Sequence, residues 1–471
     1  MSFAGPDDLQ AQEVTVYPAL PNHQYGSDLY EVTVSQAGQS HPSYVYKSTR
    51  QGPNPWNVFT TDANHWTSFS FSGPVTVLIT VRNGNAVKLA TVRPLAKQIR
   101  ATVVGNTVSF TLTKPANLFV ELDGQPREPL FIFANPPEAN APTASTPNVI
   151  YFGPGVTDLG ATPHSVADGQ TVYLAGGAYV KGRLQTTARQ GKQGVTIRGR
   201  GVLSGIGITE NRGTFGQFMI DASSQKPATD LSVEGIVVTD SPGPGCFCGG
   251  RLTAENVKLL AWTRCSDGIG GGAGSLVKGC FLKVNDDNIH FHVSGMKAIN
   301  NVVWLQAAGS ALQMGWNVKQ SVDGEHADGL DIIGNDMGRT RTKHDWLNAN
   351  AVALMDMHNR TVYKNIVIEN IRHEGRPYQL FGVRIKLAAE DPGHASYREG
   401  RGCVDGMILK NITSAQLPLH PSVFDGNGSE PGTISNVTFE NLRIAGELVT
   451  DKNAPAHIAP RGKTSGFRYV Q

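Results

Sequence analysis

The chain has 471 residues, which is too long for one ordinary compact domain and predicts either two domains or one large elongated architecture. Its 53 glycines and charged fraction of 17% predict a β-rich protein with many tight turns and little helix. The formal net charge of +2 argues against nucleic acid or an anionic membrane as the main partner. The apolar runs are far shorter than the roughly 20 residues that span a bilayer, so we expect no membrane segment.

The first residues, MSFAGPDDLQAQ, contain neither a basic segment nor an apolar segment of the signal-peptide type. Either such a peptide was removed or the protein never had one. The five cysteines show no zinc-type paired spacing, so we expect buried core cysteines, with one disulfide among the first four as the alternative. They are Cys246, Cys248, Cys265, Cys280 and Cys403.

Residues 1–135 are predicted to form an N-terminal β-sandwich domain. About eight short alternating strands follow one another here, with Gly105-Asn106 as a type I′ hairpin turn. Residues 136–150 are rich in proline and small residues and lack apolar periodicity, which predicts a linker. Residues 151–471 form the remaining predicted domain.

A short motif recurs in residues 151–471, in which alternating apolar residues surround a Gly or an Asn. The Gly or Asn positions are Gly199, Gly235, Asn256, Gly279, Asn301, Asn335, Asn370, Asn411 and Asn441. The steps between Gly235, Asn256, Gly279 and Asn301 are 21, 23 and 22 residues. A basal step of 21 to 23 residues predicts a right-handed parallel β-helix with three short strands in each coil. Gly and Asn adopt the left-handed conformation of a sharp turn at least cost, and stacked asparagines can hydrogen-bond from coil to coil.

Three carboxylates carry the predicted chemistry. Asp267 lies 19 and 20 residues before Asp286 and Asp287, inside the region of 21- to 23-residue steps, so the β-helix would place them on adjacent coils of an exposed face, about 4.8 Å apart. Like charges packed together raise the proton affinity of at least one acid, and glycoside hydrolysis needs one protonated acid and one ionised base. The alternatives are ordinary turn aspartates and a calcium site, although a calcium ion would need further oxygen ligands.

Four further residues are predicted to contact a substrate. Gln313 and Trp316 lie one coil beyond the acids, and tryptophan is a common stacking platform for a sugar ring. Alternation along 382–387 sends Arg384 and Lys386 to the outer face together, where they bind sugar hydroxyls or acidic groups, or form a solvated face.

His290 and His292 flank the acids on one strand face. Without a third ligand at metal spacing we expect them to contact substrate or to pack, and we predict no metal and no cofactor. The segment 326–330, His-Ala-Asp-Gly-Leu, resembles a degenerate copy of the Ser-Asp-Gly-Ile element around Asp267 and predicts the turn of another coil.

At these residues the sequence resembles the polygalacturonase-like β-helix glycosidases. Ser266-Asp267-Gly268-Ile269 stands where that clan has Asn-Thr-Asp-Gly, Asn285-Asp286-Asp287 stands at its Asp-Asp pair, and Arg384-Ile385-Lys386 matches literally. Segments 171–180 and 199–205 also resemble the first coils of the clan. The histidine of the clan's Gly-His-Gly element is absent near 309–311.

The preceding β-sandwich, with Ser43-Tyr44-Val45-Tyr46, and the spacing of the three aspartates resemble glycoside hydrolase family 49, the dextranase and isopullulanase family. This resemblance covers nearly the whole chain. It implies an inverting mechanism with Asp286 as the general acid and with Asp267 and Asp287 activating water.

The expected activity is therefore the endo-hydrolysis of α-1,6-glucosidic bonds in a dextran-like α-glucan, by a monomer located extracellularly or in the periplasm. Two alternatives stay open. One is a hydrolase of galacturonan or of another acidic or sulfated polysaccharide with the same fold, and the other is a carbohydrate-binding adhesin without activity.

Overall fold

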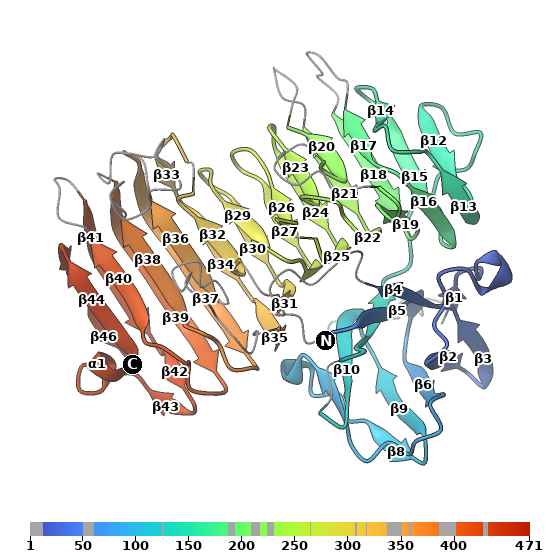
Figure 1. The fold of residues 1–471 in the computed structure, drawn as a ribbon, viewed down its shortest axis with the longest axis horizontal. Helices are drawn as coiled ribbons and strands as arrows, with labels where there is room; N and C mark the ends of the chain where they lie inside the picture. The colour runs from blue at the N-terminus through green and yellow to red at the C-terminus, as the bar shows by residue number, and fades with distance from the viewer. Residues whose placement is uncertain are drawn as a thin grey trace, which may run out of the picture. The chain divides into compact units, whose positions relative to one another are not determined.

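The fold is taken from a computed structural model, which forms two compact units (Figure 1). The first unit holds described residues up to Pro142 together with Gly153–Gly155, and the second holds the rest of the chain from Thr143. The structure describes residues 13–49, 61–124, 127–186, 194–208, 217–223, 230–263, 265–306, 309–316, 318–336, 351–357, 360–385, 402–426 and 432–471.

The first unit is a β-sandwich of two sheets. One sheet contains β1 (Glu13–Val16), β5 (Ala63–Ser72), β11 (Leu130–Asn135), β10 (Ala116–Leu122) and β7 (Ala90–Arg93) in that order, with β4 (Val45–Thr49) also paired to β5. The other contains β3 (Gln39–Ser43), β2 (Tyr30–Gln36), β6 (Val75–Val81), β9 (Thr107–Leu112) and β8 (Thr102–Val104). Short 3₁₀ helices lie at Pro21–His23 and Leu95–Lys97.

Period-2 alternation explains the sandwich core. In β2 and β6 every second residue is fully buried, and Val34, Val77 and Ile132 pack in one apolar cluster. The predicted type I′ turn at Gly105-Asn106 is wrong, because only Gly105 has a positive φ (60°). A glycine at the first central position with an ordinary second residue is typical of a type II′ turn.

The second unit is a parallel β-helix, in which the short coils contribute three strands each and pair with the coils before and after them. Figure 1 shows these strands stacked in chain order from teal to red. The coil of β24 (Leu252–Glu255), β25 (Lys258–Leu260) and β26 (Ile269–Gly270) is followed by β27 (Leu276–Lys278), β28 (Phe281–Lys283) and β29 (Ile289–Phe291). The predicted fold class, a β-sandwich followed by a β-helix, is confirmed.

The third strands of successive coils form one sheet of 11 strands, and the remaining strands form a second set of 24. The 11-stranded sheet contains β14 (His164–Val166), β17 (Leu184–Thr186), β20 (Ile220–Ala222), β23 (Cys246–Cys248), β26, β29, β32 (Leu312–Met314), β36 (Ala353–Met357), β38 (Phe381–Ile385), β40 (Ser422–Gly426) and β44 (Ile458–Gly462).

The 24-stranded set contains β24, β25, β27, β28 and the following strands: β12 (Val149–Phe152), β13 (Gly155–Asp158), β15 (Thr171–Leu174), β16 (Ala178–Lys181), β18 (Val195–Gly199), β19 (Val202–Ser204), β21 (Leu231–Glu234), β22 (Val237–Thr239), β30 (Lys297–Ile299), β31 (Val302–Leu305), β33 (Val322–Asp323), β34 (His326–Asp328), β35 (Asp331–Asn335), β37 (Val362–His373), β39 (Cys403–Ser414), β41 (Thr433–Glu440), β42 (Arg443–Ile444), β43 (Glu447–Leu448), β45 (Thr464–Ser465) and β46 (Arg468–Val470).

The helix α1 (Ala454–His457) is short, and within the described ranges no helix is long and apolar enough to cross a membrane. The core of the β-helix is apolar and includes Cys246, Cys248 and Cys280. All five cysteines lie in the described ranges and none forms a disulfide, so the alternative of a bridge is wrong. Cys246, Cys248 and Cys280 are buried as expected, whereas Cys265 and Cys403 are partly exposed.

The turn residues differ from the prediction at two positions. Seven of the nine predicted Gly and Asn residues have positive φ, but Asn301 and Asn335 do not, and the turns of their coils lie at Asn300 (φ 54°) and Gly329 (φ 75°). Asn301 is buried instead, and its side chain bonds to the backbone of Val277 and Cys280. The error arose because two asparagines adjoin at 300–301 and because the Gly-Asn pair at 334–335 belongs to a strand, β35.

The predicted stacking of asparagines is confirmed in the C-terminal coils. Asn441 Nδ2 donates to Asn411 Oδ1 (3.0 Å), Asn411 Nδ2 donates to Asn370 Oδ1 (3.1 Å), and Asn370 Nδ2 donates to Asp328 Oδ1 (2.7 Å). This asparagine ladder therefore begins on a carboxylate and fixes the turns of four coils relative to one another.

Candidate active site

Asp267 and Asp287 occupy equivalent places in adjacent coils. Each lies two residues before a third strand, and Ile269 of β26 pairs in register with Ile289 of β29. The Gly268 N–H donates to the Asp287 carbonyl at 2.8 Å, which fixes the two turns one above the other. The structure thus brings Asp267 together with Asp287 and its neighbour Asp286.

These carboxyls are partly buried, which differs from the exposed face that the spacing predicted. The side chain of Asp267 is 13% exposed. Asp287 Oδ1 accepts two hydrogen bonds from the next coil, from the Ser310 backbone N–H (2.9 Å) and from the Ser310 hydroxyl (3.1 Å). Both bonds fix the orientation of the Asp287 carboxyl.

Burial and mutual repulsion change the proton affinity of this cluster. Burial raises the pKa of Asp267 to about 7. The pKa of Asp287 lies well above its ordinary value because of burial first and then the charges of Asp286 and Asp267, while the Ser310 hydrogen bonds lower it. Since neighbouring acids titrate as a unit, the cluster retains at least one proton near neutral pH.

Gly309 provides the space for this arrangement. Its φ is +71°, and a Cβ there would lie 2.0 Å from the Asp286 carbonyl carbon. Only glycine tolerates both the backbone conformation and this close approach. In the sequence, residues 309–311 were notable only for the absence of the Gly-His-Gly histidine, and neither Gly309 nor Ser310 was predicted to belong to the site. The signal that could have found Ser310 is its position one coil after Asp287.

A pair of histidines adjoins the acids. His290 Nε2 lies 3.4 Å from Asp267 Oδ2, its ring packs edge-on against Phe247, and the His290 and His292 ring centroids are 4.7 Å apart. Burial lowers the pKa of His290 to about 4. Burial, followed by the proximity of His290, lowers the pKa of His292 to about 3 against the opposing effect of Gln313. Both imidazoles are therefore neutral near pH 7.

Gln313 and Trp316 lie one coil beyond the acids, as predicted. Gln313 is the register partner of His290, and its side chain hydrogen-bonds to the His292 ring and to the Met314 carbonyl. Because the Gln313 side chain is almost fully buried, it supports His292 and is not open to a ligand. Trp316 is partly exposed directly after β32.

Arg384 is separated from the acids along the β-helix axis. The third-strand sheet runs from β29 through β32 and β36 to β38, so Arg384 lies three coils further, which is about 14 Å at the spacing of parallel strands. Its Nη2 approaches Gln379 Oε1 at 3.5 Å, and the alternation in β38 leaves the side chain partly exposed as predicted. Lys386 lies outside the described residues.

The segment 326–330 does form a turn, at Gly329, but it is not a copy of the Asp267 element. His326 to Asp328 form β34, which pairs with β30 in the 24-stranded set and not in the third-strand sheet. Its side chains therefore belong to another face of the β-helix.

Comparisons with known proteins agree with this fold over nearly the whole chain. The sequence is 25% identical over 541 residues to a dextranase of Arthrobacter globiformis, covering 90% of this chain and 82% of the relative. It is 23% identical over 529 residues to an isopullulanase of Aspergillus niger, covering 93% and 89%. No family model matches.

Among solved structures, Dex49A from Penicillium minioluteum superposes with a TM-score of 0.72 at 18% identity and covers 97% of this chain and 96% of that chain. At this identity the superposition shows the fold.

Proposed function

We propose that this chain, a glycoside hydrolase of the dextranase and isopullulanase type of family 49, cleaves α-1,6-glucosidic bonds within a dextran-like α-glucan and inverts the anomeric centre. The observation that carries the proposal is the stacking of Asp267 on the Asp286-Asp287 pair in adjacent coils. The relatives named dextranase over most of this chain support the choice of linkage.

In the proposed reaction Asp286 donates its proton to the glycosidic oxygen as the bond from that oxygen to the anomeric carbon breaks. Asp267 and Asp287 accept a proton from water, whose oxygen forms the new bond to the anomeric carbon from the opposite face. Water is consumed, and a reducing end and a free hydroxyl are formed. The carboxylate that took the proton from water then releases it to solvent, and Asp286 takes a proton from solvent.

The raised pKa values of Asp267 and Asp287 favour a proton shared within the cluster. A base is most efficient when its pKa lies near the working pH, and the pKa of Asp267 is raised to about 7. The pKa of Asp287 is raised partly by the charge of Asp286, so a proton on Asp286 favours ionisation of Asp287. One proton shared by the cluster therefore gives one acid and ionised partners.

His290 is proposed as a positioning residue for Asp267. Its neutral ring lies 3.4 Å from Asp267 Oδ2 and is held between Phe247 and His292, which Gln313 anchors in turn. This chain of contacts restricts the rotation of the Asp267 carboxyl without placing a cation beside it. Preorganisation of this kind reduces the cost of aligning water with the sugar.

Two residues are proposed to contact the glucan beyond the cleaved bond. Trp316, one coil from the acids and partly exposed, offers a ring face to a sugar. Arg384, three coils away, is proposed to bind hydroxyls of a more distant sugar unit. Because a polysaccharide of this size does not cross a membrane unaided, we also propose that the enzyme acts outside the cytoplasm.

A substrate panel tests the proposal. Purified protein is incubated with dextran, pullulan, polygalacturonate and a sulfated glycan, and reducing ends are measured. We expect release from dextran, with β-configured new reducing ends seen first by proton NMR. Release from polygalacturonate or the sulfated glycan alone would replace the α-glucan with an acidic substrate, for which Arg384 is a suitable partner. α-configured first products would exclude inversion.

A further inference from the structure

A column of charged side chains runs along the first strands of the β-helix. Successive register partners at one position are Arg198, Glu234, Glu255, Lys278, Ile299, Asp328, Glu369, Lys410 and Glu440. Most acids of this column have a basic neighbour: Glu255 pairs with Lys278 at 2.7 Å and Glu440 with Lys410 at 2.9 Å.

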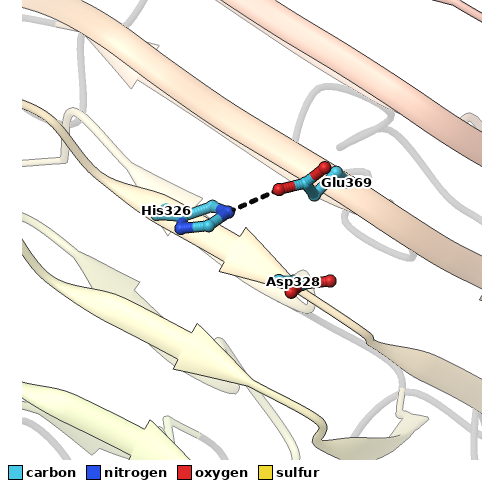
Figure 2. A group of neighbouring side chains, drawn as sticks. All are labelled: His326, Asp328 and Glu369. Carbon is cyan, nitrogen blue, oxygen red and sulfur yellow. Dashed lines mark hydrogen bonds and ion pairs between the residues drawn. The ribbon is translucent and has the colours of Figure 1, made fainter.

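Two steps of the column place carboxylates directly in register, Glu234 with Glu255 and Asp328 with Glu369. The second step differs because the residue below Asp328 is the uncharged Ile299, whereas the residue below Glu234 is Arg198. A histidine, His326, lies two residues before Asp328 on the same strand face. Figure 2 shows its ring directed toward the Glu369 carboxylate, with Nε2 at 2.8 Å from Oε1.

One ligand atom from each of His326, Asp328 and Glu369 lies within 4.8 Å of the other two. This set is partly exposed: the side chains of His326 and Glu369 are 33% and 23% exposed. Solvent can therefore reach the space between the three groups and complete the coordination of an ion.

The carboxylate of Asp328 is oriented from outside the cluster. Asn370 Nδ2 donates to its Oδ1 at 2.7 Å, and Asn370 is itself fixed by the asparagine ladder. Hydrogen bonds of this kind from a second layer of residues orient the ligands of metal sites. The three donors also sit on regular strands, β34 and β37, which hold them rigidly.

We propose that His326, Asp328 and Glu369 bind a first-row divalent cation such as Zn²⁺. One imidazole nitrogen and two carboxylates suit such an ion, whereas Ca²⁺ prefers six or more oxygen ligands. The ion neutralises the stacked acids and links two successive coils. The site lies on strands of the 24-stranded set, whereas the three aspartates lie in turns before strands of the 11-stranded sheet, so its role is stabilisation and not hydrolysis.

The competing interpretation is a surface His–Glu ion pair with a nearby aspartate, which would bind no metal specifically. The two interpretations differ in stoichiometry and in the response to single substitutions, because an ion pair of exposed groups contributes little and needs no third partner.

Isothermal titration of tag-free, chelator-treated protein with Zn²⁺ tests the proposal. We expect one saturable site per chain, with affinity weakened in His326→Ala and in Glu369→Gln by more than the roughly 10- to 100-fold that loss of a second-layer partner costs. Ca²⁺ should bind much more weakly. Glu255→Gln is the matched control, because Glu234 and Glu255 also place two carboxylates in register in the same column. That step has no histidine: Ser232 and Thr253 stand at the position that corresponds to His326.

Zn²⁺ should also raise the melting temperature of the wild type and of Glu255→Gln, but not of the two site variants, since only a ligand of the folded state stabilises it. Absence of saturable binding, or equal binding by His326→Ala and the wild type, would overturn the proposal. Circular dichroism confirms that each variant is folded. Glycoside hydrolysis should be unchanged in His326→Ala, so this outcome is independent of the proposed catalytic roles.

Discussion

Two groups of side chains in the β-helix are built by the same stacking but lie in coils of different length. Asp267 and Asp287 occupy equivalent places at the two ends of a short coil of basal length. Asp328 and Glu369 are register partners at the two ends of a coil that insertions make about twice as long. In both cases parallel pairing brings one carboxylate above another at about 4.8 Å.

The surroundings separate the two groups chemically. Asp267 lies in a turn before a third strand, where its side chain is 13% exposed and burial raises its pKa to about 7. The pair His326 and Glu369 lies on an open strand face and is more exposed. Partial burial therefore favours proton transfer at the first group, whereas access to solvent favours an ion at the second.

The largest expected effect is on hydrolytic activity, which should depend on the three aspartates and not on the His326, Asp328 and Glu369 group. Asp286→Asn removes the proposed proton donor and should lower kcat by about 10³-fold, since general acid catalysis contributes about 10²- to 10⁴-fold. Asp328→Asn, an equal change in the second group, should leave kcat unchanged. Initial rates of reducing-end release from dextran measure both. Normal activity of folded Asp286→Asn would refute the assignment.

The next effect concerns the space around the acids. Gly309→Ala should destabilise the protein by about 3–5 kcal/mol and also lower activity, because strain at positive φ and a clash with the Asp286 backbone add together. Gly274→Ala has nearly the same φ, +72°, but nothing lies within 4 Å of its Cβ, so about 1–2 kcal/mol is expected. Chemical denaturation measures both. Equal losses would show that the close approach is unimportant.

A smaller effect is expected on the pH profile. The Ser310 hydroxyl lowers the pKa of Asp287 by hydrogen-bonding to its ionised form, so Ser310→Ala should raise that pKa further. If Asp287 must be ionised for activity, the acidic limb of the pH profile moves to higher pH, and the rate on that limb falls about tenfold, since such a bond is worth about 1.5–3 kcal/mol. If the acidic limb of the pH profile did not shift, Asp287 would not be one of the bases that activate water.

The smallest effect tests the long coils. Asn411→Gly keeps the left-handed turn but removes two bonds of the asparagine ladder, and should cost about 1–3 kcal/mol. Asn300→Gly is the control, because Asn300 has the same turn conformation and its side chain makes no hydrogen bond to the part of the chain that the structure describes. Thermal unfolding compares the two. A cost for Asn300→Gly as large as that for Asn411→Gly would mean that the ladder contributes little.

The fold could be predicted because its signals are local and repeated. A turn that needs positive φ selects Gly or Asn in each coil. The short coils repeat this choice at nearly equal spacing, at Gly235, Asn256 and Gly279. The same period placed Asp267 beside Asp286 and Asp287. It failed at Asn301, where the adjacent Asn300 makes the turn, and at Asn335, which lies in strand β35 while Gly329 makes the turn.

The amino-acid sequence alone determined the β-rich class, the coil period and the three aspartates, because alternation, turn conformation and a short repeat depend only on neighbouring residues. Only the tertiary structure decided that Ser310 bonds to Asp287, that His290 adjoins Asp267 and that Glu369 meets His326. Those contacts depend on the register between coils, which long insertions set. The pKa values depend on partial burial. No local pattern of the sequence encodes either the insertions' effect on register or the burial.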